Sequence, residues 1–249
     1  MRENEIKRDL RSLSQLLSNW DKNVKNPNVL NNDLVFTPGG GNINYSLERS
    51  TPLIFKDIDL ERHSIPSGIE NLNSNEKDFE VHLNILLSEV TSDDDPNFDP
   101  ILRLGVAIKV KGDYIKADSL KSVICSWHLD RDSTATSGYS HPTYHLNFGG
   151  DHMTSFAIAE DGYFGNLLLL PNPRIIHPPM DLILSCDFII KNFYKKSRHQ
   201  KITDLPAYKT LVDRASKRYW ASFANAFASK WNNDLIVKNL SHNNVIGNH

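Results

Sequence analysis

Four segments between residues 79 and 148 alternate apolar and polar residues, and this alternation limits the possible folds more than any other feature of the sequence. Apolar residues take every second position in 79–87, 102–110, 123–129 and 142–148. Successive side chains of a strand point to opposite faces, so each segment is expected to bury one face and keep the other polar. Strands of this kind favour an antiparallel sheet with one buried face.

Apolar residues spaced by three and four predict helices before and after these strands. In segment 5–20, Ile6, Leu10 and Leu13 begin an apolar stripe that is typical of an amphipathic helix. Two C-terminal helices are predicted over 181–193 and 207–231. The first of them follows two prolines and carries an aspartate at its start, which suits a helix N-terminus.

Three further segments, 43–47, 53–60 and 164–170, have weaker strand patterns. With them the sequence predicts an α+β fold: an antiparallel sheet of about five to seven strands packed by an N-terminal helix and two C-terminal helices. Residues 1–231 are expected to form a single domain. The Asn-rich segment 232–249 is expected to be a loose C-terminal tail.

The composition of the chain favours a cytoplasmic protein. No apolar run approaches the roughly 20 residues that cross a bilayer, and the charged segment 1–10 is unlike a signal peptide. The two cysteines, Cys125 and Cys186, lie in apolar stretches, which favours reduced, buried thiols over a disulfide. We therefore expect no membrane association.

Charge is unevenly distributed along the chain. Residues 56–99 hold twelve acids and three bases, whereas residues 191–218 hold nine Lys or Arg and two acids. A basic segment of this kind can bind nucleic acid, so 191–218 is a candidate nucleic-acid surface. The alternative is a solvated helix face beside an acidic loop.

Common catalytic and cofactor motifs are absent from the sequence. It contains no phosphate-binding GxxxxGK[ST], no GxSxG nucleophile motif, no HExxH and no CxxC pair. The triplet Gly39–Gly41 precedes no predicted helix and is expected to form a turn. The common nucleotide, hydrolase and zinc-finger classes are therefore disfavoured, and the cofactor is unknown.

Polar residues gather on one face of the last two alternating strands. His128 and Asp130 share a face of the first, and His141, His145 and Asn147 share a face of the second. A hairpin that is symmetric about the intervening loop pairs His128 with His145. The same register pairs Ser126 with Asn147 and Asp130 with Thr143, and a slip of one residue would break it.

This register allows two kinds of chemistry. Cβ atoms of cross-strand partners lie about 5 Å apart, so His128 and His145 could share a proton or a metal ion, with Asp130 as an orienting group or third ligand. His141 and His145 lie about 13 Å apart along a strand and cannot ligate one metal. The alternative is that these residues form the solvated side of the sheet.

A proline-rich segment, 171–181, enters the predicted helix at 181. Arg174 and His177 lie within it, and a helix N-terminus favours an anion, so both are candidate anion-binding residues. A purely structural alternative pairs Arg174 with Asp181 or Asp187. Asp187 can equally pair with Lys191, one helical turn later.

The strings Ser140–Gly150 (SHPTYHLNFGG) and Pro173–Asp181 (PRIIHPPMD) resemble a pattern of an uncharacterised bacterial family of unknown function, found in variable loci such as mobile elements and phage-defence islands. The resemblance covers about residues 123–194. It implies a bacterial, cytosolic accessory or defence role, and it implies no catalytic residue.

Two classes of function remain open. The first is a non-enzymatic accessory or binding component of a bacterial multi-protein system, for instance in anti-phage defence, with a protein or nucleic-acid partner. The second is a hydrolase of phosphate esters or nucleic acid, with His128, Asp130 and His145 as catalytic residues. His141, Asn147, Arg174 and His177 are the candidate binding residues.

Overall fold

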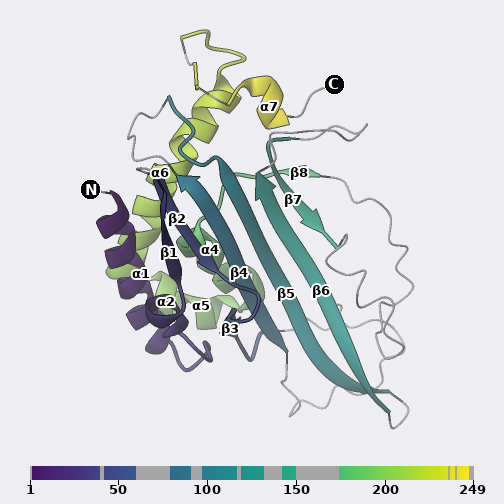
Figure 1. Ribbon diagram of the computed structural model, residues 1–249. Helices are drawn as coiled ribbons and strands as arrows, with labels where there is room; N and C mark the ends of the chain where they lie inside the picture. Colours follow the sequence, from purple (N-terminus) through teal and green to yellow (C-terminus); the bar gives the residue numbers. More distant parts are fainter. Residues whose placement is uncertain are drawn as a thin grey trace.

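The computed structural model describes residues 2–39, 42–59, 79–90, 97–116, 119–131, 142–149, 174–234, 236–238 and 240–246. Its centre is an eight-stranded sheet in which every neighbouring pair is antiparallel (Figure 1). The order across the sheet is β1-β2-β4-β5-β6-β7-β8, and β3 pairs with β4. The strands are β1 (Val35–Gly39), β2 (Asn42–Leu47), β3 (Leu53–Phe55), β4 (Glu80–Val90), β5 (Arg103–Lys116), β6 (Ser119–Arg131), β7 (Tyr144–Phe148) and β8 (Ile175–Ile176).

Helices from both ends of the chain cover one face of the sheet (Figure 1). Their apolar sides merge with the strands into one core, to which α1 contributes Ile6, Leu10 and Leu13, each at most 1% exposed. The predicted α+β fold is confirmed. The helices are α1 (Arg2–Ser18), α2 (Val29–Asn32), α4 (Leu182–Phe193), α5 (Lys196–Thr203), α6 (Pro206–Ala228) and α7 (His242–Ile246).

The alternation of apolar residues is what divides the sheet into two faces. On β4 and β5, residues such as Val81, Leu83 and Val106 are buried toward the helices. The residues between them point to the opposite side, which we call the polar face. The polar face comprises His82, Asn84 and Leu86 of β4, Gly105, Ala107, Lys109 and Lys111 of β5, Ser126, His128 and Asp130 of β6, and His145 and Asn147 of β7.

Several elements differ from the sequence-based expectation. Gly39, expected in a turn, is the last residue of β1, and residues 40 and 41 lie outside the described residues. Because β1 is an edge strand, Pro38 is tolerated in it, since it need not donate to a second neighbour. A separate helix, α5, precedes α6. In the segment expected to be a loose tail, Val237, Leu240 and Val245 are at most 7% exposed, because α7 packs on α6. The strand expected at 164–170 lies outside the described residues.

The structure bears on two features that the composition suggested: the state of the cysteines and the presence of membrane-spanning helices. Cys125 and Cys186 are both free thiols, and burial raises the pKa of each. Within the described ranges, no helix has the length and apolar character to cross a membrane.

Candidate functional site

The pairing of β6 with β7 decides which polar side chains meet. His128 lies opposite Asn147, and Asp130 lies opposite His145. The predicted register, with His128 opposite His145, is therefore wrong by two residues. Side chains alternate with a period of two, so this shift keeps the same residues on the polar face and changes only their partners.

A buried carboxylate explains the observed register. Arg131 and Tyr144 are directly opposite each other, and both bind Asp99, which is 1% exposed. Arg131 Nε donates to Asp99 Oδ2 at 3.1 Å, and the Tyr144 hydroxyl donates to Asp99 Oδ1 at 2.9 Å. Burial raises the pKa of Asp99, and the Arg131 charge opposes that shift. This contact anchors the ends of β6 and β7 from the helix side of the sheet.

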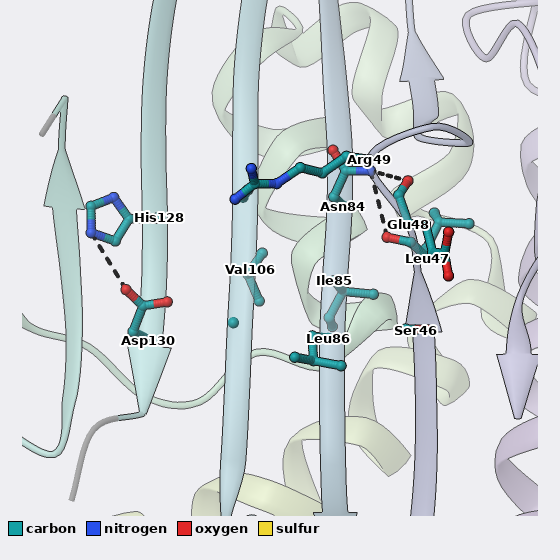
Figure 2. Close-up of a pocket in the computed structure, with 12 residues that line it drawn as sticks. Ser46, Leu47, Glu48, Arg49, Asn84, Ile85, Leu86, Val106, His128 and Asp130 are labelled. Carbon is teal, nitrogen blue, oxygen red and sulfur yellow. Dashed lines mark hydrogen bonds and ion pairs between the residues drawn. The ribbon is translucent and has the colours of Figure 1, made fainter. Parts of the chain in front are cut away.

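His128 is held between two polar neighbours on the polar face. Its Nε2 lies 3.4 Å from Asp130 Oδ2 (Figure 2). The same atom lies 3.1 Å from Asn147 Nδ2. A protonated Nε2 donates to the carboxylate, whereas an unprotonated Nε2 accepts from the amide. The ring is largely buried, with 12% of the side chain exposed, while 39% of the Asp130 side chain is exposed. Asp130 is thus the more accessible member of the pair.

His145 lies opposite Asp130, and its ring is hydrogen-bonded to the backbone just before its own strand. It is 3% exposed, and its Nδ1 lies 3.0 Å from the carbonyl oxygen of Pro142, which can only accept, so Nδ1 carries the proton. His128 and His145 are diagonal neighbours, whose separation is about 7–8 Å in an antiparallel pair. Among the described residues, no group of three or more His, Cys, Asp or Glu is placed to hold a metal ion.

A hollow of about 590 Å³ lies beside the His128–Asp130 pair on the polar face. Its floor runs across β5, where Gly105 and Ala107 lie opposite Asp130 and His128 and have little or no side chain to fill the space. Leu86, which is 55% exposed, is also part of the floor. The lining residues are Ser46, Leu47, Glu48, Arg49, Asn84, Ile85, Leu86, Gly105, Val106, Ala107, His128 and Asp130.

Arg49 forms the far wall of the hollow. Asn84 holds the turn after β2 by donating its Nδ2 to the carbonyl oxygen of Glu48 at 2.5 Å. From this turn the Arg49 side chain extends across β4 toward β5 (Figure 2). Sequence analysis missed Arg49, because nothing in its local spacing marks it. Asn84, which holds this turn, occupies an ordinary polar position of the alternating segment 79–87, so its burial and its contact appear only in the structure.

Three cations lie near this wall. Within the described ranges, Arg49, Lys109 and Lys111 form no ion pair. Burial lowers the pKa of Lys109, and the charges of Arg49 and Lys111 lower it further. Lys111 lies opposite Glu80, but that carboxylate contacts Lys25 and His82 instead. This part of the polar face therefore concentrates positive charge.

Arg174 and His177 do not form a joint anion site. The His177 ring packs edge-on against Phe188 of α4, with centroids 6.1 Å apart, so it lies on the helix side, where burial lowers its pKa. The register of β8, extended by one residue, places Arg174 opposite Asn147 instead. Asp187 pairs with Lys191 at 2.8 Å, as one alternative predicted. His141 lies outside the described residues.

The basic segment 191–218 is largely neutralised within the chain. Seven of its nine Lys and Arg residues form ion pairs, and the other two are Lys195 and Lys196. The pairs are Lys191–Asp187, Arg198–Asp59, Lys201–Asp21, Lys209–Asp204, Arg214–Asp9, Lys217–Asp213 and Arg218–Asp9. This segment therefore offers few free charges to a nucleic acid.

Comparison with family models, with curated proteins and with solved structures finds no match to this chain. The hollow has one wall at Arg49 and Glu48, a histidine–carboxylate wall at His128 and Asp130, and a floor of small and apolar residues. Such a site can hold a ligand that carries a negative group at one end and hydrogen-bonding groups at the other.

Proposed function

We propose that the protein is a non-enzymatic binding component that holds a phosphate-bearing ligand in the hollow on the polar face. The observation that supports this most is the group of cations at Arg49, Lys109 and Lys111, which have no ion pair within the described ranges. Burial lowers the pKa of Lys109, and the nearby charges of Arg49 and Lys111 lower it further. Cations held close together repel, and a bound anion relieves that repulsion. The volume of the hollow, about 590 Å³, falls in the range of about 300–1,000 Å³ that is usual for small-molecule sites.

Each wall has a distinct role in this proposal. Arg49 supplies a planar guanidinium that can bind two phosphate oxygens at once, and Lys109 adds a compact charge nearby. Asp130 accepts a hydrogen bond from a ligand hydroxyl or amine, and His128 orients its carboxylate. Gly105 lines the floor and has no side chain that would enter the hollow. A Cβ there would lie 3.7 Å from Asp130 Oδ1, in ordinary contact, whereas a longer side chain would enter the hollow.

The binding test is calorimetric titration with a panel of phosphate compounds: inorganic phosphate, AMP, ATP and a short single-stranded oligonucleotide. We expect Arg49→Ala to weaken binding of the best ligand at least about tenfold, because a charge-assisted contact contributes roughly 1.5–3 kcal/mol. Gly105→Leu should abolish binding by filling the hollow.

Matched controls accompany these variants. Lys191→Ala removes an exposed cation that is already paired with Asp187, and Gly105→Ala adds one methyl group in ordinary contact. Both should bind as the wild type does. Equal affinity in wild type and Arg49→Ala, or no binding of any phosphate compound, contradicts the proposal.

A second candidate is a phosphate-ester hydrolase in which His128 and Asp130 act as an acid–base pair. The 3.4 Å contact between them favours it. The burial of His128 Nδ1 argues against the hydrolase. Because Nε2 faces Asp130, the ring would have to accept a proton through Nδ1, and that atom is buried. Turnover of a phosphate ester that is lost in Asp130→Asn, with ligand binding retained, would favour the hydrolase over the binding component.

We also propose, on the family resemblance of segments 140–150 and 173–181, that the protein works with a protein partner in a cytoplasmic bacterial multi-protein system, with anti-phage defence as one such setting. The test is co-purification of the tagged protein from its native host, followed by identification of proteins retained at high salt. Recovery of the protein alone would contradict a stable multi-protein assembly.

A further inference from the structure

A second polar cluster lies inside the helical layer, away from the polar face. Helices α4 and α6 pack against each other, and each presents two polar residues one helical turn apart. These are Asp181 and Ser185 at the start of α4, and Arg218 and Ser222 on α6. Asp181 and Ser185 are 0% exposed, Ser222 is 2% exposed, and the Arg218 side chain is 10% exposed.

Part of this cluster is accounted for by direct contacts. Asp181 Oδ1 accepts from the Leu184 backbone N–H at 2.9 Å and caps α4. Arg218 donates from Nη2 to Asp9 of α1, whose other oxygen accepts from Arg214 at 2.6 Å. Arg218 also lies close enough to Asp181 for its charge to lower the pKa of that carboxyl, against the larger effect of burial.

Four buried polar atoms of the cluster have no hydrogen-bond partner among the described residues. They are Asp181 Oδ2, Ser185 Oγ, Arg218 Nη1 and Ser222 Oγ. Buried polar groups are almost always hydrogen-bonded, because an unmade bond costs the full desolvation of the group. Four such atoms on two facing helices point to a common bound partner.

The chemistry of the four atoms specifies that partner. One atom only accepts, one only donates, and the two hydroxyls do both. The charges already balance, since Asp9 and Asp181 face Arg214 and Arg218, so a bound ion would leave an uncompensated charge. A neutral molecule with two donors and two acceptors matches, and internal waters typically make about three hydrogen bonds to groups of this kind.

We propose that one or two internal water molecules bridge α4 and α6 at Asp181, Ser185, Arg218 and Ser222. This site is independent of the hollow on the polar face. It joins the N-terminus of α4 to the ion pairs of α1 and α6. The Tyr45 hydroxyl, 3.4 Å from the Leu182 backbone nitrogen, connects it to β2 of the sheet.

Water-¹⁷O magnetic relaxation dispersion, which counts long-lived internal waters, tests this site on the full chain. Ser222→Val fills the space of the hydroxyl and removes its hydrogen bonds, and we expect it to lose about one long-lived water. Ser216→Val is the matched control, because Ser216 lies on the exposed side of the same helix, where its hydroxyl donates to the carbonyl of Asp213. An equal water count in the two variants would overturn the proposal.

A high-resolution crystal structure of the wild type decides the question if Ser222→Val does not fold. We expect an ordered water within hydrogen-bonding distance of at least three of the four atoms. A direct bond between Asp181 Oδ2 and Arg218 Nη1, with both serine hydroxyls bonded to helix carbonyls and no water between them, would overturn the inference.

Discussion

Two regions of the molecule are rich in positive charge, and they use it differently. In the helical segment 191–218, seven of nine basic residues are ion-paired, two of them with the fully buried Asp9. On the polar face, Arg49, Lys109 and Lys111 are farther apart in sequence but close in space, and within the described ranges they form no ion pair. The more basic segment is thus the less available to a ligand.

The difference comes from where the acids lie. The partners of the helical bases include Asp9, Asp21 and Asp59, which are far from them in the sequence. The polar-face cations come from a turn and one strand, and Glu80, which lies opposite Lys111, is occupied by Lys25 and His82. A high density of basic residues in the sequence therefore does not predict a surface of unpaired positive charge, because the fold decides which acids lie beside those bases.

The largest expected effect in this comparison is on the helical side. Asp9→Ala leaves Arg214 and Arg218 without their shared carboxylate, and breaking a buried ion pair typically costs about 3–5 kcal/mol. Chemical denaturation measures the change in the free energy of unfolding. Asp213→Ala is the control, because its exposed pair with Lys217 should contribute about 0.5 kcal/mol or less. If Asp9→Ala resembles this control, the helical charges are not structural.

A pH dependence of intermediate size is expected from Asp181, which lies beside Arg218. Burial raises its pKa from 3.8 to about 6. The folded state therefore binds more protons than the unfolded state between about pH 4 and 6, so the free energy of unfolding falls as pH rises through this range. The expected fall is on the order of 2 kcal/mol.

Asp181→Asn is the matched variant for this measurement. An amide oxygen can still accept from the Leu184 backbone N–H, so the cap on α4 is kept while the titration is removed. The difference between wild type and variant should shrink toward pH 4 and grow toward pH 6. A constant difference across this range would show that Asp181 does not titrate there.

The same contrast explains what could be predicted from the sequence. Strands β4, β5 and β6 were located from alternation, because burial on one face has a local signature. The β6–β7 register was not, since it depends on Asp99, which lies 32 residues from Arg131 and 45 from Tyr144. His128 and Asp130 were found as a pair on one face. Arg49 was not, because the Asn84 contact that holds its turn links residues 36 apart.

The smallest expected effect is on the polar face and concerns the charge of one lysine. Removing Arg49 takes away one of the charges that lower the pKa of Lys109, so that pKa should rise in Arg49→Ala. NMR titration of the lysine Nζ signals measures the change. Lys191→Met, which removes a paired cation of α4, should leave the pKa of Lys109 unchanged.

Surface substitutions such as Arg49→Ala usually alter the free energy of unfolding by less than about 0.5 kcal/mol. A shift of the Lys109 pKa with little change in stability would mean that the polar face holds its cations close together without needing them for folding. An unchanged pKa in Arg49→Ala would mean that Arg49 and Lys109 do not act on the same ligand, and would remove Lys109 from the proposed site.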